Sequence, residues 1–156
     1  MKTEKTIEAL NTLVEINNDR IEGYETALKE TKEADLKVLF TRLMETSQKC
    51  KTELVNEVQK LGGTPTEGTK ITGKFFRVWM DVKAALSTND RKTVLTSCEY
   101  GEDVAVATYN KVLRNHMEDI SAEQQDLLNA QHLLIKADHD KVKSLRDMSV
   151  EQNSSL

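Results

Sequence analysis

The stretch Cys98–Tyr109, CEYGEDVAVATY, decides the fold because it places one carboxylate in the middle of an otherwise apolar helical stripe. The stripe repeats every three or four residues, as one face of an α-helix does, through Cys98, Glu102, Ala105 and Tyr109. An ionised carboxylate on such a face is costly to bury unless it is paired, hydrogen-bonded or neutralised. Glu102 therefore needs a partner from another part of the chain.

The same periodicity predicts four long helices and one shorter helix. We expect them at about residues 6–32, 35–61, 75–86, 90–117 and 121–148. Asp35 can cap the second helix, Asn89 or Asp90 can begin the fourth, and Ser121 with Gln124 forms a capping box for the fifth. The turns after the first and fourth helices are short, so each of these helices must lie antiparallel to the next one.

The fold class that follows is an all-α four-helix bundle. Two antiparallel hairpins are joined by a long crossover, which begins with the polar, glycine-rich residues 64–73 and contains the shorter helix at about 75–86. No strand pattern is visible. We expect one bundle domain at residues 1–148, followed by a flexible C-terminal tail at 149–156, where apolar periodicity stops.

Composition excludes several classes of partner. The chain has 22 Lys and Arg against 26 Asp and Glu, with both signs interspersed, so it offers no basic surface for nucleic acid. No run approaches the roughly 20 apolar residues that span a bilayer, and the N-terminus does not resemble a signal peptide. Two cysteines without a CxxC spacing fit a reducing compartment. We therefore expect a cytoplasmic protein without nucleic-acid or membrane partners.

Depth along the helices predicts a polar layer in the bundle. Each helix rises about 1.5 Å per residue, so residues equally far from a tight turn lie at the same height. Counting from the two short turns brings five residues to within a helical turn of the middle: Asn17, Ser47, Cys50, Glu102 and Asp138. Two carboxylates in such a layer require compensation.

Two interpretations account for this layer. In the first, a single divalent metal binds Glu102 and Asp138 together with His139 or Cys50. In the second, which we favour, one carboxyl is protonated and shares its proton with the other. The hydrogen bonds are then completed by Asn17 and by the phenol of Tyr24 or Tyr109. Metal sites need a fuller ligand set than these positions supply.

The chain also resembles a known group of proteins. Glu102, Ala105 and Tyr109 match the E-x-x-A-x-x-x-Y pattern of rubrerythrin and ferritin-like helices. The segments LNTLVEINNDRIEGYETAL, LGGTP, CEYGEDVAVATYNKVL and HDKVKSLRD, in this order, resemble a bacterial ferritin-like four-helix-bundle family of unknown function, the domain-of-unknown-function 2383 type. The likeness covers residues 6–148. It implies the same fold as the helical pattern does.

The resemblance implies a ligand layer that this chain does not retain. Di-iron ferritin-like proteins supply Glu, Glu-x-x-His, Glu and Glu-x-x-His from four helices. The corresponding positions here are Asn17, Ser47, Cys50, Glu102, Ile135 and Asp138, of which one is unchanged and one is a shorter acid. This argues against oxygen activation or ferroxidase chemistry. A shifted register could instead recruit Glu25, Glu99 or His139.

Two functions remain open from the sequence. The first is a non-enzymatic structural, interaction or stress-related protein without a cofactor, self-associating as a homodimer or larger oligomer through Phe76 and Met80 on the crossover helix. The second is a protein that binds iron, manganese or zinc through the reduced carboxylate site in the core.

Overall fold

The computed structural model describes the backbone of residues 2–68 and 73–154, and the side chains of residues 3–68 and 77–149. Five helices make up the described chain: α1 (Lys2–Glu30), α2 (Ala34–Lys60), α3 (Gly73–Ser87), α4 (Arg91–Asn115) and α5 (Ala122–Ser154). No strand occurs in the described ranges. None of the described helices is both long enough and apolar enough to cross a bilayer.

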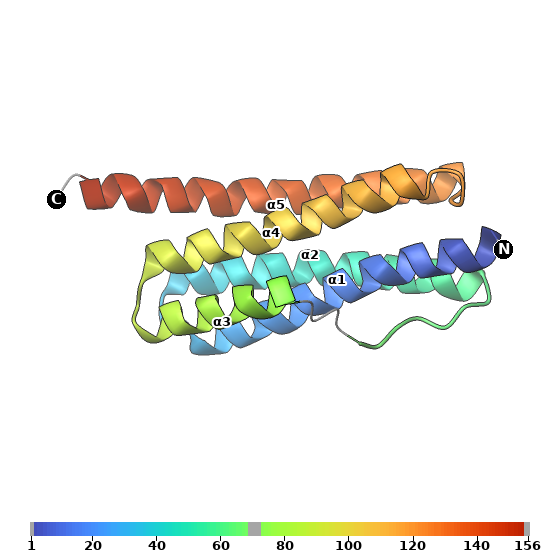
Figure 1. The fold of residues 1–156 in the computed structure, drawn as a ribbon. Helices are drawn as coiled ribbons and strands as arrows, with labels where there is room; N and C mark the ends of the chain where they lie inside the picture. The colour runs from blue at the N-terminus through green and yellow to red at the C-terminus, as the bar shows by residue number, and fades with distance from the viewer. Residues whose placement is uncertain (1, 69–72, 155–156) are drawn as a thin grey trace.

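The helices form two antiparallel hairpins, α1 with α2 and α4 with α5, which lie side by side (Figure 1). Between the hairpins, α1 contacts α4 and α2 contacts α5, so the four long helices enclose one interior. The crossover runs from the end of α2 to α3, which packs against α4 and α1. The predicted fold class, an all-α bundle of two hairpins with a shorter crossover helix, is confirmed.

Side-chain caps explain where two of the helices begin. The Asp90 carboxylate accepts a hydrogen bond from the Thr93 amide at 3.1 Å, which caps α4 as predicted. Ser121 and Gln124 form the predicted capping box at α5, with reciprocal bonds of 2.9 and 3.1 Å. The prediction for Asp35 was wrong, because Glu33 is the N-cap of α2 and makes no side-chain cap bond.

The apolar core is divided into two clusters by a polar layer. One cluster surrounds Leu10, Leu54 and Leu128, and the other surrounds Phe40 and Leu95. On each long helix, a short buried polar segment separates the residues that belong to one cluster from those of the other. Burying each large apolar side chain contributes about 1.5–3 kcal/mol, so both clusters anchor the layer between them.

The packed part of α5 extends beyond the domain boundary predicted at residue 148. The backbone stays helical to Ser154. Ser149 is buried, and its hydroxyl accepts a hydrogen bond from Arg91 Nε at 3.3 Å. This contact comes from an arginine at the start of α4, which α5's own periodicity cannot reveal. Flexibility of the residues after Ser149 stays a prediction.

Gly23 on α1 permits the close approach of α3. An added Cβ at this position would overlap the Trp79 indole ring, which packs against both core clusters. At Gly101 on α4, by contrast, an added Cβ would meet one methyl carbon of Val78 at 3.1 Å. The absence of a side chain is therefore required at Gly23, while Gly101 meets only the end of one side chain.

We expect Gly23→Ala to destabilise the protein by about 1–2 kcal/mol, because overpacking by Trp79 outweighs the gain in helix propensity. Gly101→Ala is the matched control and should be neutral or stabilising. Urea unfolding measures both changes. Trp79 is the single tryptophan, so its emission should shift to the red only in Gly23→Ala. Equal stability of the two variants would show that α3 does not depend on this contact.

A buried arginine–carboxylate cluster as the candidate functional site

The layer between the two apolar clusters contains the residues that depth counting brings together. Asn17, Ser47, Cys50 and Glu102 are fully buried, and Asp138 is 2% exposed. They come from all four long helices. The polar layer is therefore a feature of the structure, and what compensates its two carboxylates can be read from its contacts.

Arg20 compensates Glu102, and helical periodicity alone does not identify it as a buried residue. This arginine is fully buried on α1. Its Nε donates to Glu102 Oε2 at 2.8 Å, and its Nη2 donates to Glu102 Oε1 at 2.5 Å. A bidentate arginine–carboxylate pair of this kind is both stronger and more directional than an ordinary hydrogen bond. The partner that Glu102 requires is thus a guanidinium group within the chain.

The same guanidinium extends the cluster to two more helices. Its Nη1 donates to Ser47 Oγ at 2.5 Å, and its Nη2 lies 3.5 Å from Asp138 Oδ2. The other oxygen of Asp138 accepts from Arg42 Nε at 3.2 Å, and Arg42 is about half exposed. Two carboxylates therefore face two guanidinium groups, which makes the cluster neutral in charge.

Aromatic packing fixes the position of the buried guanidinium. The Arg20 Cζ lies 5.7 Å from the centroid of the Tyr24 ring, within the range of a cation–π contact. Tyr24 in turn stacks on Phe40 at 5.8 Å and meets Trp79 edge-on at 5.0 Å. Arg20 is consequently held by an ion pair on one side and by an aromatic stack on the other.

Burial and pairing act in opposite directions on these charges. Burial raises the pKa of the Glu102 carboxyl, and the Arg20 guanidinium opposes that rise. For Arg20, burial is the largest single influence and lowers the pKa, but the charge and hydrogen bonds of Glu102, together with Tyr24 and Asp138, outweigh it, so the net pKa is raised above its ordinary value. Arg20 stays charged and binds both oxygens of Glu102, while burial leaves the net pKa of the Glu102 carboxyl above its ordinary value. Sharing one proton between Glu102 and Asp138 is not needed to explain the layer.

A second buried network lies beside the cluster. Asn17 Nδ2 donates to Tyr109 Oη at 2.9 Å, and the Tyr109 hydroxyl donates to Gln131 Oε1 at 2.8 Å. Gln131 Nε2 donates to the Cys50 carbonyl at 3.2 Å. Asn17 and Tyr109 bond to each other and not to the carboxyls. The other phenol considered, that of Tyr24, makes a hydrogen bond that lowers the pKa of Glu102. Burial raises the pKa of the Cys50 thiol to about 11, so it stays protonated.

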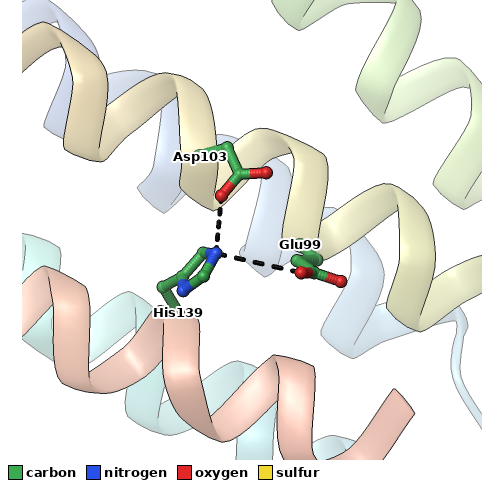
Figure 2. A group of neighbouring side chains, drawn as sticks. All are labelled: Glu99, Asp103 and His139. Carbon is green, nitrogen blue, oxygen red and sulfur yellow. Dashed lines mark ion pairs between the residues drawn. The ribbon is translucent and has the colours of Figure 1, made fainter. Parts of the chain in front are cut away.

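The four residues predicted as metal ligands do not form one group. Among the described residues, the only set of three or more such side chains with ligand atoms within 4.8 Å of one another is Glu99, Asp103 and His139 (Figure 2). His139 therefore lies with Glu99 and not with Glu102 or Asp138. Both residues belong to the alternative ligand set that a shifted helix register predicts. Glu25 is exposed and pairs with Lys29.

The proposed interface residues are only partly placed by the structure. Met80 on α3 is 57% exposed. The side chain of Phe76 lies outside the described residues. A hollow of about 380 Å³ beside Met80 is lined by α1 and α3, including Gly23, Trp79 and Leu86.

The fold and the cluster define a class of protein: an all-α bundle whose central polar layer is held by arginine–carboxylate pairs. The chain belongs to a family described as a domain of unknown function (DUF2383), whose family model matches residues 5–115. The match covers α1 to the end of α4, so it includes Arg20 and Glu102 but not Asp138 or His139. A search of curated proteins finds no match.

We expect Arg20→Met to destabilise the protein by about 3–5 kcal/mol, because it leaves Glu102 buried without its partner. The double variant Arg20→Met/Glu102→Leu should recover most of this loss, since it removes both charges together. Urea unfolding at pH 7 measures the change, with the exposed Arg77→Met as the control. If Arg20→Met costs no more than Arg77→Met, the pair does not hold the core.

The loss in Arg20→Met should also depend on pH. Without the guanidinium, only burial acts strongly on Glu102, so its folded pKa rises further above the unfolded value. A raised carboxyl pKa gives stability that is present below the unfolded pKa and is lost as pH rises through the folded pKa. Arg20→Met should therefore be closer to wild type near pH 4.5 than at pH 7 in urea unfolding. An equal difference at both pH values would contradict this assignment.

Proposed function

We propose that this protein is a non-enzymatic, ferritin-like bundle that acts as a structural or interaction module. In it, an arginine–carboxylate cluster stands where a di-metal protein has its ligands. One observation carries the proposal: the Arg20 guanidinium occupies both oxygens of Glu102, the one ligand position that is unchanged. The buried guanidinium of Arg20 neutralises the carboxylate as a metal ion would, but it has no redox chemistry.

The other ligand positions support the same conclusion. Both oxygens of Asp138 face guanidinium groups, one from Arg20 and one from Arg42. Ile135 stands at a ligand position without a donor atom and is fully buried in the apolar core. A divalent cation could enter only by displacing Arg20 into an apolar surrounding, where an unpaired charge costs several kcal/mol. The oxygens that would bridge two metal ions are already paired with guanidinium groups, so we propose that this layer does not carry out carboxylate-bridged metal chemistry.

Metal analysis tests this proposal. Protein purified without chelators should give the same iron, manganese and zinc content in the wild type and in Arg20→Met/Glu102→Leu, which removes the core carboxylate without leaving a buried charge. Adding Fe²⁺ in air should give no oxygen uptake above the buffer rate with wild-type protein. Stoichiometric metal that is present in the wild type and lost in the double variant would overturn the proposal and favour the core metal site.

An interaction role is supported by the exposed side of α3. Met80 projects beside the hollow between α1 and α3, whose apolar wall includes Trp79 and Leu86. Exposed apolar side chains beside a concave surface are typical of protein contacts. We assign this face to a second copy of the chain, so that the protein is a homodimer or a larger homo-oligomer.

We expect Met80→Lys to shift the protein toward the monomer, because a charge would have to be buried in the contact. Multi-angle light scattering at several concentrations measures the mass. Val38→Lys on α2 is the matched control, since Val38 is 72% exposed and lies on another helix. An unchanged mass in Met80→Lys, or an equal change in both variants, would reject this face as the interface.

A further inference from the structure

A second group of ligand-type side chains lies between α4 and α5, distinct from the buried cluster. Glu99 and Asp103 are one helical turn apart on α4, and His139 projects toward them from α5 (Figure 2). His139 Nε2 lies 2.5 Å from Asp103 Oδ1 and 4.0 Å from Glu99 Oε1. Three atoms that commonly bind divalent cations thus converge from two helices.

The state of the imidazole favours a ligand at Nε2. His139 Nδ1 lies 3.1 Å from Asp140 Oδ1. A carboxylate that accepts from Nδ1 fixes the tautomer whose Nε2 lone pair is available, as in many metal-bound histidines. Nε2 itself is buried, and it faces the carboxylate oxygens of Asp103 and Glu99.

The carboxylates of Glu99 and Asp103 both face Nε2 of His139. Arg146 pairs with Glu99 Oε2, which leaves Oε1 on the side of His139. The Glu99 and His139 side chains are 12% and 15% exposed, whereas Asp103 is 58% exposed. Two ligands are thus held by the protein, and the third can adjust at the solvent edge.

The distances suit a small cation. Zinc binds nitrogen and carboxylate oxygen at about 2.0–2.2 Å, which places neighbouring tetrahedral ligands about 3.4 Å apart. The 2.5 Å and 4.0 Å separations bracket that value. A small rotation of the exposed Asp103 side chain would open the shorter separation, and water would complete the coordination.

We propose that Glu99, Asp103 and His139 bind one first-row divalent cation, such as zinc, at the solvent edge of the α4–α5 hairpin. Glu99 Oε1, Asp103 Oδ1 and His139 Nε2 are the ligand atoms, and Asp140 is the positioning residue for the imidazole. This site is separate from the Arg20 cluster, so it does not depend on the absence of metal from the core.

Calorimetric titration of metal-stripped full-length protein with zinc chloride at pH 7.5 tests the site. Wild type should bind one zinc per chain, and His139→Gln should lose that binding. Asp140→Asn should weaken it by about 10–100-fold, the usual effect of removing the carboxylate behind a ligand histidine. His132→Gln, on the same helix but outside the group, is the matched control and should bind as wild type does.

A second variant keeps the test decisive if His139→Gln unfolds. Asp103→Asn changes an exposed side chain and should also lose the stoichiometric binding, while circular dichroism stays that of the wild type. Cobalt(II) in place of zinc should give a visible absorption band that both ligand variants lack. No stoichiometric binding to wild type, or equal binding to His139→Gln and Asp103→Asn, would show that the group is an ion-pair cluster only.

The results also separate this site from the proposal for the core. Zinc lost in His139→Gln but kept in Arg20→Met/Glu102→Leu supports both proposals. Zinc lost in the core double variant but kept in His139→Gln contradicts both. No zinc in any variant overturns the α4–α5 site and leaves the proposal for the core standing.

Discussion

The ion pair between Arg20 and Glu102 is the interaction on which the rest of the structure depends. It places a cation and a carboxylate, both fully buried, between two apolar clusters. An unpaired charge at this depth costs several kcal/mol, whereas the bidentate pair satisfies both groups. Ser47 and Asp138 connect the same guanidinium to α2 and α5, so all four long helices are held at one height and in one register.

The pair also limits what the bundle can do. Buried ion pairs often add little net stability over apolar residues of similar volume, but they penalise every arrangement that separates the charges. In this chain the penalty acts against slipped helices. The group of ligand-type side chains among the described residues, Glu99, Asp103 and His139, lies outside this layer, between α4 and α5.

Much of the fold could be predicted from the sequence, because periodicity and short turns are local signals. Depth counting even brought Glu102 and Asp138 together. Arg20 was missed because an arginine is ordinarily exposed, so it was not counted among the buried positions of the first helix. His139 was placed with Asp138, yet consecutive helix residues point about 100° apart, so both cannot face one site. The contacts of Arg20 and His139 depend on the length and direction of the side chains. Residue spacing along a helix does not give either property.

Crystals of the protein grown with excess manganese, with anomalous diffraction data, would show whether Arg20 or a metal ion pairs with Glu102. We expect guanidinium density between Ser47, Glu102 and Asp138, and no anomalous peak within bonding distance of Glu102. An anomalous peak at Glu102, with Arg20 displaced from the layer, would contradict it. Because the map locates the cation itself, the answer does not depend on how any variant folds.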